Sequence, residues 1–372
     1  AKMSITSHER VLRACHFERP DRIPRFDSFW ELPPAWERRL GPPESLSDIA
    51  IWCPREGAFP TRAKLLERRG DWTVRVDDWG RTVRSRDGAY FDEVLEVPIP
   101  PGCDPEHIVF DAPCLDLRYA IHGGDLQATA SKLAADKSNY CVFGKTGGPY
   151  LRTSFVRGTE QFLMDMAGDV CLARALVDKM VDHLIAVGVE LLRRWDLSDS
   201  GVWIYDDMAH NGGPMFSPDS FERVLLPAYR RMIRAYKEAG ARYVVLHSDG
   251  NILPILDMLV DAGIDGLNPL ERRTGMIAEQ LRRRYPQLIL TGGMCNTQTL
   301  PLGSAAEIES EAKTLIELGR DGGFIIGTHS VSPEIPLESF ATYQRTCETH
   351  GDFTDAAPED QAAGSVVRKA RE

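Results

Sequence analysis

The sequence lacks three features that mark large classes of protein: paired cysteines, a long apolar run and an excess of basic charge. Its eight cysteines stand singly among 372 residues, with no CxxC motif. This spacing fits free thiols in a reducing compartment better than a disulfide framework. No apolar stretch approaches the roughly 20 residues that a membrane helix needs. Because no signal-peptide pattern is visible either, we expect a soluble, cytoplasmic protein.

Basic charge is scarce, since the formal net charge is −11 at pH 7. Binding to nucleic acid or to an acidic membrane needs a basic surface, so neither partner is expected. A small molecule is the partner that this composition favours. With 43% hydrophobic residues, the chain is long enough to form a large core in one big domain or two ordinary ones.

From about residue 140 onward, short apolar segments alternate with amphipathic ones. The apolar runs are continuous, which is typical of parallel strands covered by helices on both faces. The expected strands are "YCVFGKTG", "GVWIYDD", "RYVVLHSDG", "GIDGLNPL", "LILTGGM" and "GFIIGTHS". An eight-fold barrel and a doubly wound sheet both satisfy this pattern.

Polar residues at the ends of these segments favour the barrel. In a barrel all carboxyl ends of the strands open to one mouth, whereas an open sheet gathers only those at its switch point. We therefore predict an α/β fold, a (β/α)8 TIM barrel. The polar residues at strand ends are Lys145, Asp206, Asp207, His247, Asp249, Asn268, Glu271, Cys295 and His329.

Helix signals and the less regular N-terminal part complete the predicted organisation. Helices are expected over 217–240, with a kink at Pro227, over 251–263, and over 304–319 with a capping box. The first 135 or so residues form an elaborated N-terminal region, in which "DRIPRFDSFW" reads as a first strand and "DWTVRVDDWGRTVRSRDGAYF" as a hairpin. We expect one domain over 4–350 and a flexible tail over 351–372, which has few large apolar side chains.

The stretch "HSDGN" ends one of the predicted strands and carries the strongest chemical signal. His247 and Asp249 lie two residues apart, His329 ends another strand, and Glu271 follows a third. Two imidazoles and one or two carboxylates at one mouth form a credible site for zinc or another divalent metal. The alternative is structural: Asp249 or Asn251 caps the helix that follows.

Acidic and polar residues elsewhere at the mouth are further candidates. Adjacent carboxylates such as Asp206 and Asp207 raise one another's pKa and can serve as acid, base or metal ligand. A helix cap together with a solvated charge is the competing interpretation of this pair. The candidates for substrate binding are Tyr150, His210, Asn251 and Asn268.

Several longer motifs follow one another along the chain. They are "HERVLRACHFERPDRIP", "DDWG", "GGPYLRTSFVRGTEQFLMDM", "DDMAHNGGPMFSPDSFERVLLPAYRRMI", "HSDGNILPILDMLVDAGIDGLNPLE", "LTGGMCNTQTL" and "GTHSVSPEIPLESF". In this order they resemble the uroporphyrinogen decarboxylase (URO-D) superfamily, in particular the branch that includes cobamide-dependent methyltransferases. The resemblance spans about Ser7 to Cys347 and implies one barrel domain with its site in the mouth.

Departures from the superfamily's patterns narrow the expected chemistry. True decarboxylases carry an N-terminal arginine-rich segment that grips the substrate's carboxylates. The corresponding stretch here, "RFDSFWELPPAWERR", is acidic and aromatic. Decarboxylation of a porphyrinogen with eight carboxylates is therefore not expected.

The methyltransferases of the superfamily hold zinc with a His-x-Cys pair and a distal Cys. By resemblance His247 matches the histidine, Asp249 stands at the first cysteine and His329 at the distal one, so a divalent metal, Zn²⁺ by preference, would have harder ligands. Glu271 would complete the coordination or act as an acid, and Asp206 or Asp207 would orient the substrate or protonate it. The methyl group would pass from a small substrate, such as a methyl ether, to a corrinoid (cobalamin) on a separate protein, or from a methylcorrinoid to an acceptor.

Two other functions stay open at this point. One is a metal-free decarboxylase or lyase acting on a small carboxylic acid, with Asp207, Asp249 and His329 as acid and base groups. The other is a non-catalytic barrel that binds a corrinoid or tetrapyrrole. A homodimer is a further expectation, because isologous pairing is the usual default for soluble enzymes.

Overall fold

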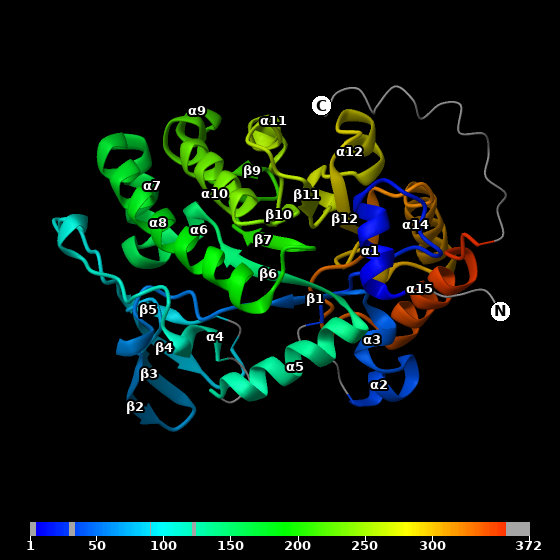
Figure 1. Ribbon diagram of the computed structural model, residues 1–372, viewed down its shortest axis with the longest axis horizontal. Coiled ribbons are helices and arrows are strands. Elements are labelled where there is room, and N and C mark those ends of the chain that lie inside the picture. Colours follow the sequence, from blue (N-terminus) through cyan, green and yellow to red (C-terminus); the bar gives the residue numbers. More distant parts are fainter. Residues whose placement is uncertain (1–4, 30–33, 90, 121–123, 355–372) are drawn as a thin grey trace.

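The computed structural model describes residues 5–29, 34–89, 91–120 and 124–354. Its centre is a parallel seven-stranded sheet in which every neighbouring pair of strands is parallel (Figure 1). The predicted apolar segments all form strands of this sheet. The sheet begins at one edge with β1 (Ile49–Trp52). The predicted strands follow it in this order: β6 (Cys141–Gly147), β7 (Gly201–Tyr205), β10 (Tyr243–His247), β11 (Gly266–Asn268), β12 (Ile289–Gly293) and β13 (Phe324–Gly327).

An eighth extended segment, residues 23–28, closes this sheet into a barrel. On one side the backbone N–H of Phe26 donates to the carbonyl of Ile326 in β13 at 2.8 Å. On the other side the N–H of Asp48, just before β1, donates to the carbonyl of Arg25 at 2.8 Å. The segment corresponds to the predicted first strand, although it pairs through isolated bridges. The predicted (β/α)8 architecture is confirmed.

The interior of the barrel follows the two-residue period of its strands. Residues that point inward form one apolar cluster, in which Trp203 meets Phe26 edge-on at 5.0 Å between ring centroids. The alternate residues pack outward in a second, larger cluster that includes Val142, Val202, Ile204, Val244, Leu246 and Leu290. Continuing the inward positions toward the carboxyl ends brings Lys145, Tyr205 and His247 to the mouth.

Helices cover the outside of the barrel (Figure 1). The longest of them, α8, is apolar along one whole face and buries twelve of its residues. The covering helices are α5 (Leu126–Asn139), α6 (Pro149–Arg157), α7 (Thr159–Gly168), α8 (Val170–Trp195), α10 (Leu226–Glu238), α11 (Leu253–Asp261), α12 (Ala278–Arg284), α13 (Thr299–Leu302), α14 (Ala305–Leu318) and α15 (Leu337–His350).

The ends of the predicted helices are largely confirmed. The predicted capping box begins α14, where Ser304 and Glu307 bond each other's backbone N–H groups. The segment 217–240 is divided into α9 (Pro218–Ser220), a π-helical turn η3 (Phe221–Leu225) and α10. The distortion lies just before Pro227, which lacks an N–H and occupies the first turn of α10.

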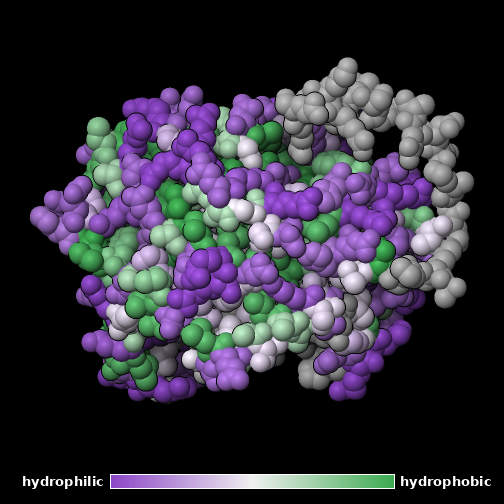
Figure 2. All heavy atoms as spheres, in the orientation of Figure 1, coloured by the Kyte–Doolittle hydropathy of each residue, from purple (hydrophilic) through white to green (hydrophobic). Residues whose placement is uncertain are grey.

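The N-terminal region supplies a plug and a separate small sheet. Helix α1 (Ser7–Cys15) packs Val11, Ala14 and Cys15 against the barrel interior. The chain between β1 and β6 forms a separate antiparallel sheet of β2 (Lys64–Arg69), β3 (Trp72–Val76), β4 (Thr82–Arg86) and β5 (Glu93–Glu96). The predicted hairpin is its β3–β4 pair. Figure 1 places this sheet at one side of the barrel, away from α12 and α14. On the face shown in Figure 2, hydrophilic side chains dominate, with hydrophobic ones between them.

Short elements connect these layers. They are α2 (Pro34–Leu40), α3 (Pro43–Leu46), α4 (Asp116–Tyr119), the 3₁₀ turns η1 (Pro60–Arg62), η2 (Pro105–His107) and η4 (Arg272–Thr274), and a two-stranded hairpin of β8 (Ala209–His210) and β9 (Gly213–Pro214). The hairpin follows β7 directly and lies against α11, next to the barrel mouth. Among the described residues, no helix is both long and apolar enough to cross a membrane.

The packed domain extends beyond residue 350. Phe353 is buried, its N–H donates to the carbonyl of Asp21, and the carbonyl of Gly351 accepts from Ile23. The predicted start of a flexible tail at 351 was therefore too early. The buried Phe353 ring and these two hydrogen bonds hold the chain from Gly351 to Phe353 against the segment that closes the barrel. The remainder of that tail, 355–372, lies outside the described residues.

Closure of the barrel predicts a sensitive position at Gly327. A Cβ atom at this residue would overlap the carbonyl oxygen of Phe26, which is backbone and cannot rotate away. Gly327→Ala should therefore lower the free energy of unfolding by about 1–3 kcal/mol, the usual cost of overpacking. The measurement is urea denaturation. Gly168→Ala, at the C-terminal end of α7, is the control, since none of the described residues has an atom within 4 Å of a Cβ placed there. Equal stability of the two variants would contradict this account of closure.

Candidate active site at the barrel mouth

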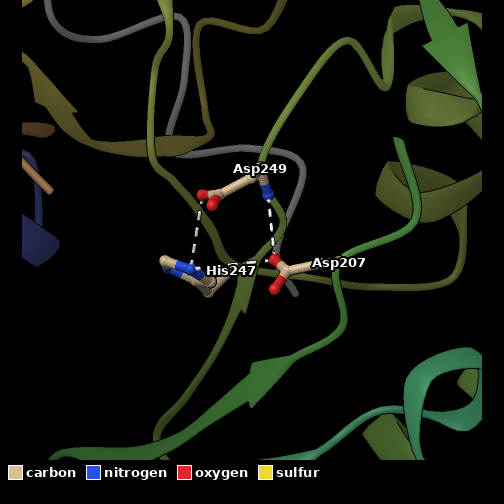
Figure 3. Close-up of side chains that lie close together, drawn as sticks. All are labelled: Asp207, His247 and Asp249. Carbon is tan, nitrogen blue, oxygen red and sulfur yellow. Dashed lines mark hydrogen bonds and ion pairs between the residues drawn. The ribbon is translucent and has the colours of Figure 1, made fainter. Parts of the chain in front are cut away.

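The stretch His247 to Asn251 turns back on itself at the mouth. His247 is the last residue of β10, and Gly250 has a φ of +82°, a left-handed conformation that favours glycine. The turn brings the Asp249 carboxylate over the imidazole of His247, so that Asp249 Oδ1 lies 3.6 Å from His247 Nε2 (Figure 3). Asp207 Oδ1 accepts the Asp249 N–H at 3.1 Å and lies 3.9 Å from the same Nε2.

Two further residues approach Asp249 from beyond the carboxyl ends of β11 and β13. His329, after β13, places its Nε2 3.6 Å from Asp249 Oδ1 and 3.7 Å from Glu271 Oε1. The other carboxylate oxygen of Glu271 accepts the N–H of Gly250. The structure thus brings together five residues that the sequence placed at strand ends, and we call Asp207, His247, Asp249, Glu271 and His329 the mouth cluster.

Neighbouring side chains fix the orientation of His247. Its Nδ1 lies 2.6 Å from Asn268 Oδ1, and Asn268 Nδ2 donates to the carbonyl of Thr291 at 3.1 Å. Because the Asn268 amide nitrogen is already used as a donor, its oxygen must accept, so the proton of the neutral imidazole is on Nδ1. The lone pair of Nε2 is then free to face the cluster, as in metal-binding histidines.

An aromatic and a cationic side chain lie behind His247. The Tyr205 ring stacks on the imidazole at 4.1 Å between centroids, and Lys145 Nζ lies 3.9 Å from the centre of the Tyr205 ring. Sequence reasoning noted Lys145 at a strand end but did not identify Tyr205. The inward register of β7 was the available signal, since Tyr205 follows Trp203 by two residues.

The electrostatics of the cluster are those of a site with surplus negative charge. Asp249 Oδ1 is buried and has no hydrogen-bond partner among the described residues. Burial, together with the charges of Asp207 and Glu271, raises the pKa of Asp249 to about 7. Burial lowers the pKa of His247 to about 4 and lowers that of His329 as well. Both imidazoles are therefore neutral at pH 7, with lone pairs available.

Asp206 and Asp207 are adjacent but have different surroundings. The Asp206 carboxylate is fully buried and accepts hydrogen bonds from the N–H groups of Tyr150 and Leu151 and from the Tyr229 hydroxyl. Burial raises the pKa of Asp206 to about 6. Its bonds hold the first turn of α6, so the contacts of Asp206 are those of a positioning residue. Of the pair, Asp207 is the one that reaches the cluster.

The four predicted substrate-binding residues are dispersed. Tyr150 is 3% exposed, with its ring against Phe162 and Phe216. His210 is exposed, and its Nδ1 accepts the N–H of Gly212. Asn251 Oδ1 accepts the N–H of Leu253, the first residue of α11, but the N-cap position of this helix is Ile252, so Asn251 is not its N-cap. Asn268 is the member of the four that hydrogen-bonds a residue of the mouth cluster.

Comparison with known proteins identifies the family. The family model of uroporphyrinogen decarboxylase (URO-D) matches residues 123–350, more than half of the chain. The chain belongs to the URO-D family. The matched range contains all five residues of the mouth cluster. Comparison with curated proteins gives no match.

A solved structure supports the same fold for this URO-D family member. A methyltransferase from Methanosarcina mazei superposes with a TM-score of 0.66, covering 92% of this chain and 98% of that one. The two sequences are 18% identical, so the likeness concerns the fold.

Because Asp206 and Asp207 have different surroundings, their substitution by asparagine should affect stability differently. Asp206→Asn places an amide NH₂ against buried N–H donors and should lower the free energy of unfolding by about 1–3 kcal/mol. Asp207→Asn keeps an oxygen for the Asp249 N–H at a half-exposed position and should change stability by no more than about 0.5 kcal/mol. Urea unfolding of both variants checks this. Equal losses would show that Asp206 does not anchor α6.

Proposed function

We propose that this URO-D family protein is a metal-dependent methyltransferase. It would bind a divalent cation, Zn²⁺ by preference, at the mouth cluster, and move a methyl group between a small oxygen-bearing substrate and a corrinoid on a separate protein. The observation that carries the proposal is the position of Asp249 Oδ1. This buried oxygen has no hydrogen-bond partner in the part of the chain that the structure describes, and it lies 3.6 Å from the Nε2 atoms of two histidines.

The residues present fit a divalent cation. Ligand atoms about 2.1 Å from a tetrahedral zinc lie about 3.4 Å from one another. The distances from Asp249 Oδ1 to each Nε2 are 3.6 Å, and His329 Nε2 lies 3.7 Å from Glu271 Oε1. These separations are too long for hydrogen bonds and close to those between ligands of one ion. Asp249, Glu271 and His329, whose ligand atoms lie within 4.8 Å of one another, would hold it, and His247, with its Nε2 3.6 Å from Asp249 Oδ1, would join them.

Once bound, the cation would act as a Lewis acid on the substrate's oxygen. The chain's own residues would arrange the reaction. Asn268 and Tyr205 fix the imidazole of His247, and Asp207 is the half-exposed carboxylate beside it, placed to orient a substrate or to deliver a proton to the leaving oxygen. In transfer from a methyl ether, the carbon–oxygen bond breaks, the oxygen keeps the electron pair and takes a proton, and the reduced cobalt acceptor supplies the pair for the new carbon–cobalt bond.

Two observations favour methyl transfer over decarboxylation of a polycarboxylate. Arg25 lies in the segment that corresponds to the N-terminal arginine-rich segment of true decarboxylases. It is buried and forms an ion pair with Asp27 at 3.0 Å. This guanidinium is used in the closure of the barrel and does not offer itself to a substrate carboxylate. The structural neighbour from Methanosarcina mazei bears the name of a methyltransferase, which supports the same choice.

A metal-free decarboxylase or lyase is the second candidate. A carboxyl group whose pKa is raised to about 7 by burial and by neighbouring carboxylates is suited to proton transfer at neutral pH, and Asp249 is such a group. This function needs no cation, so the metal content of active protein separates it from the first. A barrel that binds a corrinoid without catalysis would remain if neither activity were found.

Methyl transfer can be tested with purified, zinc-loaded protein, a panel of small methyl ethers and cob(I)alamin as the acceptor. We expect loss of the cob(I)alamin absorption together with formation of the demethylated alcohol. His247→Ala and His329→Ala should each reduce the rate by more than about 100-fold and lower the zinc content, because ligands contribute more than the residues that orient them. His210→Ala, which alters a histidine outside the cluster, is the control and should keep both. Activity that survives complete removal of metal would contradict the proposal.

The pH dependence of metal binding follows from the raised pKa of Asp249. Both histidines are already neutral near pH 7, so the proton that a cation must displace there is the one on Asp249. The apparent affinity for Zn²⁺ should therefore rise as the pH increases toward about 7 and then level off. Competition with a chelator between pH 5.5 and 8.5, roughly one to two units either side of that pKa, measures it. In Asp249→Asn the affinity should be weak and the rise lost; an unchanged profile would refute this assignment.

A further inference from the structure

We propose that the mouth cluster binds two divalent cations that share Asp249 as a bridging ligand. Asp207 and His247 would complete one position, and Glu271 and His329 the other. The inference rests on the metal site of the proposed function and extends it to a second ion, but it does not depend on which reaction follows.

The ligand atoms of the cluster fall into two groups. Asp207, His247 and Asp249 form one, and Asp249, Glu271 and His329 form the other; within each group all atoms lie within 4.8 Å of one another. Each group contains one imidazole and one carboxylate of its own, and Asp249 belongs to both. The division therefore gives two similar sets of donors instead of one set with two spare members.

The backbone of the turn holds Asp249 between these two sets. Asp207 accepts the N–H of Asp249, and Glu271 accepts the N–H of Gly250. The carboxylates of Asp207 and Glu271 thus bind successive peptide N–H groups of the same turn. Asp249 Oδ1 has no hydrogen bond to any residue that the structure describes, and it lies 3.6 Å from the Nε2 atoms of both His247 and His329. A carboxylate has lone pairs enough to bind two cations. Two-metal sites place their ions about 3.5–4 Å apart, which one carboxylate can bridge.

The charges of the mouth cluster also favour two cations over one. Asp207, Asp249 and Glu271 supply three negative charges when ionised, and among the described residues no lysine or arginine forms an ion pair with any of them. One divalent cation would leave the cluster negative. Two would leave one positive charge, which a bound hydroxide or an anionic substrate oxygen neutralises. A pair of ions thus matches these donors and creates a place for an oxygen ligand between them.

The decisive experiment is the metal stoichiometry of the full chain. The protein is freed of metal with a chelator, titrated calorimetrically with Zn²⁺, and analysed for zinc after desalting. We expect two zinc ions per chain, and one per chain in both Asp207→Asn and Glu271→Gln. Asp219→Asn, an exposed aspartate on α9, is the matched control and should keep two. X-ray absorption of the two-zinc protein should show a zinc–zinc distance of about 3.5–4 Å, absent from the one-zinc variants.

The outcomes separate this inference from the proposed function. One zinc in the wild type, with no loss in Asp207→Asn, would overturn the paired site and leave the single-ion methyltransferase standing. No zinc in the wild type would overturn both. Two zinc ions without a zinc–zinc distance would place the second elsewhere and also overturn the pair. The wild-type stoichiometry and distance need no variant, so the inference stays testable even if a substitution prevents folding.

Discussion

The closure of the barrel by residues 23–28 is the contact on which the rest of the site depends. This segment hydrogen-bonds to β13 through Phe26 and Ile326, and the buried Asp27 carboxylate accepts the N–H of Thr328 at 3.0 Å. His329 is the next residue, so its place at the mouth is set by a strand more than 300 positions earlier in the chain. A buried pair such as Arg25–Asp27 contributes little net stability, but it fixes one arrangement, because either partner alone would be an uncompensated charge.

The alternation of side chains along the strands explains why the mouth is polar while the barrel below it is apolar. Trp203 and Val245 fill the interior, and Tyr205 and His247, two residues further along their strands, are the first inward positions beyond that core. The apolar floor keeps water from the inner side of His247, which accounts for its lowered pKa. The same alternation of side chains along the strands therefore produces both the apolar core and the polar mouth.

Much of this arrangement could be predicted from the sequence, because long apolar runs determine parallel strands and polar residues at their ends must meet at one mouth. The five residues of the mouth cluster were found by that reasoning. It could not decide between Asp206 and Asp207, since a shift of one residue at a strand end turns a side chain to the other face. Nor could it place Tyr150 in the core or extend the domain to Phe353, because both depend on packing partners distant in sequence.

The hydrogen bonds of the turn also bear on how a cation would relate to folding. In a structural zinc site the ligands converge only when the metal binds, and the free energy of binding is spent on folding. Here Asp207 and Glu271 hold the turn through its own peptide N–H groups, and Asn268 holds His247, so hydrogen bonds within the protein position these donors. Burial, together with the negative charges of Asp207 and Glu271, nevertheless raises the pKa of Asp249. Under the proposed function, donors that the protein's own hydrogen bonds position suit a cation that acts on a substrate better than one that supports the fold, because the turn already has backbone hydrogen bonds of its own.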